Sequence, residues 1–144
     1  MLTAEELENI RFCIGNDEEV DAGIFLHGIC GVFALALHDR FGYPIKHVVV
    51  LEEPDDEDAE PYNDLIHIYC FSDNKFYDVR GWTDNKDLFF DEFSDWINGN
   101  EDYLPLDPQT CKEFVKEYMC ETQFTELYNI ALSIIDTNPE RYKK

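Results

Sequence analysis

LHGICGVFALALHDR, residues 26–40, joins a cysteine in a turn of small residues to an apolar run of helical length. Gly28 and Gly31 flank Cys30, and residues 32–37 are all apolar, which predicts a buried helix that begins at the cysteine. The unpaired amides and the positive dipole end of such a helix stabilise a thiolate, so Cys30 is a candidate nucleophile. Free cysteine is also among the most buried residue types, which leaves a small core residue as the alternative.

Cap residues set the bounds of the first two helices. The capping-box pair Thr3 and Glu6 predicts a helix over residues 4–13. Gly42 favours a left-handed cap and is expected to end the central helix near Phe41.

β-Branched and aromatic residues predict three strands, over 46–53, 65–72 and 75–81. Asp73 and Asn74 tolerate the positive φ angles of a tight turn, so the last two strands are expected to form an antiparallel hairpin.

A two-residue loop in this hairpin places Tyr69 opposite Asp78 and His67 opposite Arg80. His67 and Asp78 then become diagonal neighbours on one face, within reach of a hydrogen bond. This register predicts an imidazole and a carboxylate side by side in the sheet.

Residues 88–97 predict an amphipathic helix, and the chain is expected to be helical again from residue 107. The inward residues of the first of these helices are expected to be Leu88, Phe89, Phe93 and Trp96. The acidic run from Glu52 to Glu60 lacks the spacing of a calcium loop and predicts a solvated loop. The order of elements predicts an α+β fold, with a small antiparallel sheet packed against helices in a single domain over 1–144.

Composition narrows the classes of partner. The chain has 32 acidic and 11 basic side chains, and its formal net charge is −21. Such a field disfavours direct binding of nucleic acid or of an anionic membrane, and it attracts a basic protein or peptide. No apolar run reaches the roughly 18 residues of a membrane span, and the N-terminus is unlike a signal peptide, so we expect a cytoplasmic protein. Five cysteines without a CxxC pair are expected to stay reduced.

Cys30, His67 and Asp78 are the candidate catalytic residues. A nucleophilic thiol needs a base to take its proton, and the imidazole needs an acceptor that fixes its tautomer. The chain offers these parts in order, on a helix start and two neighbouring strands. A structural role for His67 and a pairing of Asp78 with Arg80 are the alternatives.

Four segments carry a resemblance to a known superfamily: GICGVFALAL, RFGYPI, LIHIYCF and KFYDVRGW. Together they resemble the papain-like and transglutaminase-like cysteine enzymes, over roughly Gly28 to Trp82. In that superfamily a cysteine opens a helix, a GxP follows it, a histidine lies on a strand, and an aspartate on the next strand precedes a glycine.

The resemblance implies that Cys30 is the nucleophile, His67 the base and Asp78 the orienting carboxylate. It also implies hydrolase or acyltransferase chemistry on an amide or ester of a protein or peptide substrate, through an acyl-thioester and without a cofactor. The chain lacks the usual upstream glutamine or asparagine of the oxyanion hole. We expect the Cys30 amide, with the amide or side chain of His27, to take that role.

The substrate-binding residues are expected to include His27, Gly31, Tyr69 and Trp82. By residue type, His27 could instead join Cys30, His67 and Asp78 in a zinc site, but the spacing lacks the close ligand pairs of such sites and no metal is expected. A second function is consistent with the charge. The chain would then be a non-catalytic acidic binder, such as a phage-type inhibitor that mimics nucleic acid and blocks the basic groove of a nuclease or other nucleic-acid enzyme.

Overall fold

The computed structural model describes residues 1–15, 17–97 and 99–143. The elements in chain order are α1 (Ala4–Leu7), β1 (Arg11–Ile14), β2 (Glu18–Asp21), α2 (Ile24–His27), α3 (Cys30–Phe41), β3 (Ile45–Glu52), β4 (Tyr62–Ser72), β5 (Lys75–Asp78), β6 (Gly81–Thr83), α4 (Lys86–Phe90), the 3-10 turn η1 (Asp91–Phe93), β7 (Glu101–Pro105), α5 (Pro108–Lys116), α6 (Glu121–Thr137) and α7 (Pro139–Tyr142). The predicted α+β class, an antiparallel sheet with helices, is confirmed.

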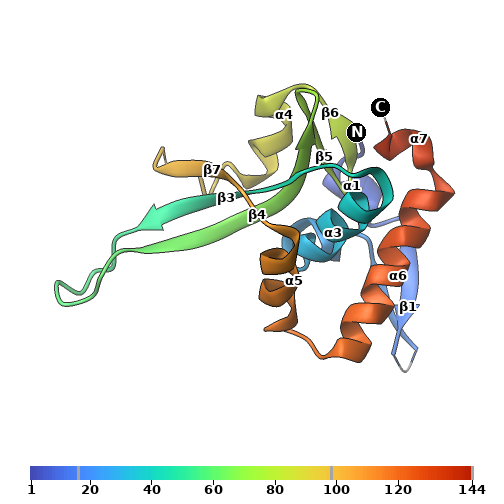
Figure 1. Ribbon diagram of the computed structural model, residues 1–144, viewed down its shortest axis with the longest axis horizontal. Helices are drawn as coiled ribbons and strands as arrows, with labels where there is room; N and C mark the ends of the chain where they lie inside the picture. The colour runs from blue at the N-terminus through green and yellow to red at the C-terminus, as the bar shows by residue number, and fades with distance from the viewer. Residues whose placement is uncertain (16, 98, 144) are drawn as a thin grey trace.

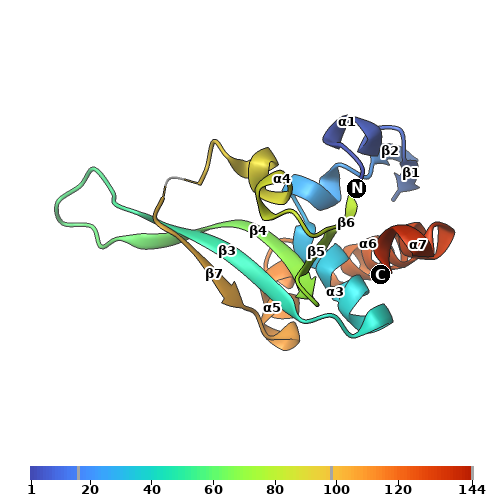
Figure 2. The ribbon, with the colours of Figure 1, turned by 90° about the horizontal axis from the view of Figure 1, so that it is seen from above.

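The main sheet has five antiparallel strands in the order β6-β5-β4-β3-β7, and β1 and β2 form a separate hairpin. Helices cover both faces of the main sheet (Figure 1). On one face, Tyr69 of β4 makes edge-to-face contacts with Phe89 and Phe90 of α4. On the other face, the Cys70 thiol donates to the carbonyl oxygen of Ala34 in α3 at 3.4 Å. The tip of the β3–β4 hairpin extends away from the helices (Figure 2).

The central helix forms where the sequence predicts it. Its residues from Cys30 to Leu37 are all buried, as expected for an apolar run between a sheet and other helices. Gly42 caps its end at φ 78°, and the Gly42 N–H donates to the carbonyl of His38 at 2.7 Å. Gly31 allows a close approach to α5, because a Cβ at this position would lie 2.6 Å from Cγ2 of Val115.

The β4–β5 hairpin has the predicted two-residue turn. Asp73 and Asn74 adopt φ values of 55° and 62°, and Ser72 pairs with Lys75. Both central residues therefore have the positive φ that such a turn requires.

The strand after this turn is shorter than predicted. β5 ends at Asp78, and the chain reverses so that Asp78 pairs with Gly81 of β6. The prediction that Arg80 lies opposite His67 is therefore wrong. Gly81 adopts φ 110° at this reversal, where a Cβ would lie 3.0 Å from the carbonyl oxygen of Arg141.

The first helix and one strand of the main sheet also differ from the sequence prediction. The first helix keeps its capping box but ends at Leu7, because residues 11–14 alternate between exposed and half-buried and pair with β2 instead. β7, which pairs with β3, was not predicted.

The predicted helix over 88–97 is α4 followed by η1. The α-helical pitch ends at Phe90, and the buried residues are Phe89 and Phe90 of α4 and Phe93 of η1. Leu88 and Trp96, predicted inward, are 53% and 52% exposed. None of the helices in the described ranges is both long enough and apolar enough to span a bilayer.

Candidate active site

The N-terminus of α3 meets the sheet at an unpaired edge of β4. β4 pairs with β5 only from Cys70 to Ser72, because β5 ends and turns away at Asp78. The backbone N–H of Ile68 lies just beyond this pairing, and it donates to Sγ of Cys30 at 3.3 Å. The sulfur thus lies where β4 loses its neighbour and accepts a hydrogen bond from a backbone amide that has no partner strand on the β5 side.

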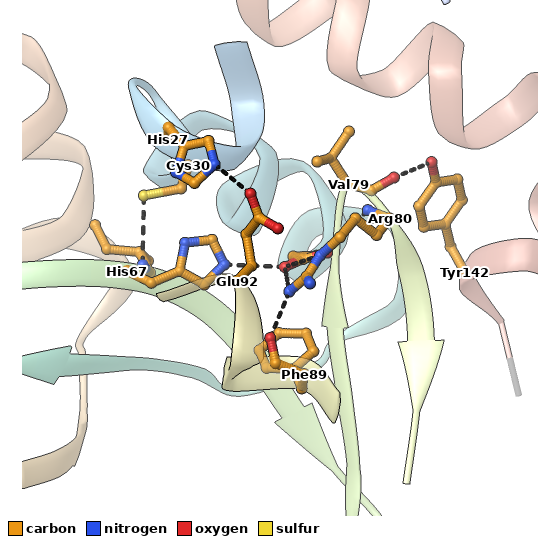
Figure 3. A network of polar contacts seen from close by, with 10 residues as sticks. His27, Cys30, His67, Val79, Arg80, Phe89, Glu92 and Tyr142 are labelled. Carbon is orange, nitrogen blue, oxygen red and sulfur yellow. Dashed lines mark hydrogen bonds and ion pairs between the residues drawn. The ribbon is translucent and has the colours of Figure 1, made fainter. Parts of the chain in front are cut away.

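His67 connects this sulfur to a carboxylate. Its Nε2 lies 3.0 Å from Oδ2 of Asp78, and both side chains are buried. Because an ionised carboxylate only accepts, Nε2 carries the hydrogen and donates it. In the neutral ring Nδ1 is then an acceptor. It lies on the side of Cys30 (Figure 3), and no described residue forms a hydrogen bond with it.

Arg80 binds the same carboxylate. Its backbone N–H donates to Oδ1 of Asp78 at 2.8 Å, and its Nη2 donates to Oδ2 at 2.7 Å and to the carbonyl oxygen of Phe89 at 2.9 Å. The guanidinium also lies 4.7 Å from the centre of the Phe89 ring. The two partners considered for Asp78, His67 and Arg80, therefore bind it together.

Two opposed effects set the charge of Asp78. Burial by itself would raise its pKa, but the Arg80 charge and the His67 hydrogen bond outweigh burial and lower the pKa to about 2. Asp78 is therefore ionised at neutral pH, and Arg80 balances its charge.

His67 is subject to a similar balance. Burial would lower its pKa, whereas the hydrogen bond to Asp78 and the interaction with Cys30 raise it, and the net shift is upward. The ring also stacks on Phe93 with centroids 4.3 Å apart. The imidazole of His67 lies between Asp78 and the Cys30 sulfur, and Asp78 in turn lies between His67 and Arg80 (Figure 3).

A β-bulge at Ile66 lies next to the histidine. Val48 pairs with His67 and Val49 pairs with Leu65, so Ile66 is an extra residue in β4. Because adjacent strand residues face opposite sides, the bulge puts His67 and Leu65 on opposite faces of the sheet. His67 faces the α4 side, while Leu65 remains on the side of α5.

A cleft of about 260 Å³ opens beside Cys30. β4 forms one wall through Asp64, Leu65 and Ile66, and α5 with the following turn forms the other through Phe114 and Tyr118. The Cys30 side chain is mostly covered, with 9% exposed, but it lies in the lining of this cleft. A substrate in the cleft would therefore reach the sulfur, while His67 stays behind it.

The other predicted site residues divide into two groups. His27 and Gly31 line the cleft with Cys30. Tyr69 is 1% exposed among core aromatic rings, and Trp82 does not line the cleft, so the structure does not bring these two residues to Cys30.

The predicted oxyanion donors are only partly available. The His27 backbone N–H is bonded to the carbonyl of Gly23, and its side-chain Nε2 lies 3.0 Å from Oε1 of Glu92. The His27 amide is therefore committed within α2, contrary to the expectation that it would face an oxyanion. The first-turn N–H groups of Cys30 and Gly31 have no acceptor inside α3 and remain candidate donors.

The remaining cysteines lie in different environments. Cys70 and Cys111 are buried, and burial raises both pKa values, that of Cys111 to about 12. Cys13 and Cys120 are exposed, and all five thiols are free. Across residues 1–15, 17–97 and 99–143, no three histidine, cysteine or acidic side chains are grouped as metal ligands.

Sequence reasoning missed several groups at this site: the Ile68 amide, the bulge at Ile66 and the Glu92 partner of His27. None has a local sequence signal, because each depends on strand register or on the packing of α4. Comparison of the chain with protein-family models, with curated proteins and with solved structures finds no match.

Proposed function

We propose that the protein is a cysteine hydrolase or acyltransferase that acts on an amide or ester bond through Cys30, His67 and Asp78. One observation carries the proposal. The His67 ring is bound at Nε2 by Asp78, and its Nδ1, on the side of Cys30, has no hydrogen-bond partner among the described residues. This arrangement suits a base that takes and returns the thiol proton.

The first chemical step forms an acyl-thioester. His67 Nδ1 takes the thiol proton, and the Cys30 thiolate attacks the substrate carbonyl carbon to form a C–S bond. The oxyanion that develops faces the N–H groups at the start of α3. The imidazolium then gives its proton to the leaving nitrogen or oxygen as that bond breaks.

The second step releases the acyl group. Water or an amine loses a proton to His67 and attacks the thioester carbon, and the C–S bond breaks to restore the thiolate. Water gives hydrolysis or deamidation, and an amine gives transamidation. Asp78 keeps the ring in the tautomer that both steps need.

The order of elements supports a papain-like or transglutaminase-like core. The cysteine opens α3, Gly42 and Pro44 follow it, the histidine lies on β4 and the aspartate ends β5. We place the chain's catalytic unit in the segment from α3 to β6 on this basis.

Residue-resolved alkylation tests the proposal. Iodoacetamide at about pH 6 should modify Cys30 ahead of the exposed Cys13 and Cys120, because a thiolate paired with an imidazolium persists at a pH where ordinary thiols are protonated. Cys70 and Cys111 should react last, since burial raises their pKa values. Peptide mass spectrometry measures each rate. A Cys30 rate no higher than the rates of Cys13 and Cys120 would overturn the proposal.

A matched pair of variants identifies the source of the reactivity. His67→Gln should lower the alkylation rate of Cys30 to the rates of Cys13 and Cys120. His47→Gln, a change of another sheet histidine whose ring bonds the Leu104 carbonyl, should leave the Cys30 rate unchanged. Circular dichroism of both variants shows whether the fold is preserved.

A second candidate function is non-catalytic binding of a basic partner, consistent with the nucleic-acid mimic considered above. The tip of the β3–β4 hairpin lies well away from α3 (Figure 1) and carries six exposed acidic residues, which are Glu53, Asp55, Asp56, Glu57, Asp58 and Glu60. Partner capture that weakens steeply with salt and persists in Cys30→Ala would favour this function.

A further inference from the structure

A second hollow adjoins the Cys30 cleft. It has a volume of about 320 Å³ and is lined by His27, Asp64, Leu65, Ile66, Phe93 and Trp96. Four of these residues, His27 and the β4 segment Asp64 to Ile66, also line the cleft. The two spaces are therefore parts of one groove along β4.

The hollow combines a free carboxylate with aromatic rings. Asp64 is exposed, and its carboxylate forms no ion pair or hydrogen bond with any described residue. Trp96 is 52% exposed, unusual for a large aromatic side chain, and its ring lies 6.0 Å from that of His27. A hollow lined by both a carboxylate and an indole is suited to a Lys or Arg side chain, which the carboxylate binds by charge and the indole by cation–π contact.

The surroundings of the hollow favour a cation. None of the described residues that line it is a lysine or an arginine, and His27 in its lining is already paired with Glu92. Arg80, the buried cation behind His67, is bound to Asp78. The net charge of −21 also draws a basic segment toward the protein.

The backbone of β4 suits an extended ligand. Between residues 62 and 69, β4 has no partner strand among the described residues on the side that β5 occupies farther along. The segment Asp64 to Ile66 therefore exposes backbone donors and acceptors along the groove. An extended peptide can pair with such an edge as an added strand.

We propose that the substrate is an extended basic peptide segment that lies along β4, with a Lys or Arg side chain held between Asp64 and Trp96 and its reacting carbonyl at Cys30. The proposal rests on the proposed function, because it names the substrate class of the same site. Asp64 is the specificity-determining residue.

Covalent probes test the proposal directly. The probes are acetyl-tripeptidyl chloromethyl ketones that carry lysine at one of the three positions and alanine at the other two. In a matched series of probes, norleucine, which has no charge, replaces the lysine. Alkylation displaces chloride and forms a thioether at Cys30, which intact-mass measurements follow. The best lysine probe should react at least about threefold faster than its norleucine counterpart, the ratio expected for one exposed ion pair supported by a cation–π contact.

Substitutions locate the preference. Asp64→Asn should bring the lysine-to-norleucine rate ratio close to one, and Trp96→Leu should lower it. Asp102→Asn, which removes an exposed carboxylate of β7 outside the groove, should keep the wild-type ratio. An equal ratio in wild type, or an unchanged ratio in Asp64→Asn, overturns the inference.

The failure of this inference is distinguishable from failure of the proposed function. Equal alkylation of Cys30 by the lysine and norleucine probes supports the function and rejects the basic substrate. If no probe alkylates Cys30, the proposed function fails, and the inference is tested by binding alone. The acetylated lysine peptide amide is then added to Cys30→Ala, and the Trp96 indole resonance is followed by NMR. A shift of this resonance that Asp64→Asn abolishes supports the inference, and the absence of a shift overturns it.

Discussion

Nε2 of His67 lies 3.0 Å from Oδ2 of Asp78, with both side chains buried between β4, β5 and α4. The carboxylate is also bound by Arg80, so the imidazole donates to an anion whose charge is already balanced. This relationship determines the tautomer of His67, the availability of its Nδ1 and the response of the site to pH.

The first prediction concerns the titration of His67. Its pKa should lie above the ordinary 6.5. The stability gained from the protonated ring is then present below pH 6.5 and is lost as pH rises through the raised pKa. Asp78→Asn should lower this pKa, because burial continues to oppose the charged ring while the carboxylate is gone. NMR titration of the ring protons measures the shift, with His47 as the internal reference. An unchanged His67 pKa in the variant would contradict the assignment.

The second prediction concerns acid stability. The Asp78 pKa is lowered from 3.8 to about 2, so its contribution to folding is present above pH 3.8 and is lost as pH falls through about 2. The difference in unfolding free energy between wild type and Asp78→Asn should therefore narrow by about 2 kcal/mol over that window. Urea unfolding at each pH measures it. Asp102→Asn, at an exposed carboxylate, should show no such narrowing.

Local signals were sufficient for the parts of the fold that short-range chemistry controls. Gly42 ends α3 because only a residue that tolerates a positive φ closes the helix there. Asp73 and Asn74 set the hairpin register for the same reason, and this register brings His67 and Asp78 together. The turn residues were therefore enough to predict that His67 and Asp78 lie within reach of a hydrogen bond.

The parts that were missed depend on distant pairing. β7 has a polar sequence and becomes a strand only because β3, more than 50 residues earlier, offers it an edge. The bulge at Ile66 lies in a continuous apolar run that shows no break of period. The end of β5 also depends on α7 packing against Gly81, a contact between residues far apart in the chain that no local pattern encodes.

The third prediction concerns the packing of α3 against α5. A Cβ at Gly31 would lie 2.6 Å from Cγ2 of Val115 and 3.2 Å from Cδ1 of Ile68. Gly31→Ala should therefore destabilise the fold by about 1–3 kcal/mol, despite the better helix propensity of alanine. The double variant Gly31→Ala, Val115→Ala should lose less than the sum of the single variants, because the second change removes the clash. Additive losses in urea unfolding would show that the close approach is not what requires glycine.

The fourth prediction separates the charge of Arg80 from its structural support. Arg80→Met should cost about 3–5 kcal/mol of stability, because it leaves Asp78 buried without its main cationic partner. The same change should raise the His67 pKa further, since the carboxylate charge is then no longer balanced and acts on the imidazole alone.

In Arg80→Met, the loss of charge balance and a loss of packing would move the His67 pKa in opposite directions. If the change only loosened the site, water would enter and move the His67 pKa back toward 6.5. The unbalanced Asp78 carboxylate would instead move the His67 pKa upward. Arg80→Lys is the matched control. It keeps the charge but not the two-pronged geometry, so it should lower stability while leaving the His67 pKa close to that of wild type. NMR titration with urea unfolding of the three proteins measures both quantities. A fall of the His67 pKa in Arg80→Met would show that Arg80 supports the site by packing rather than by balancing Asp78.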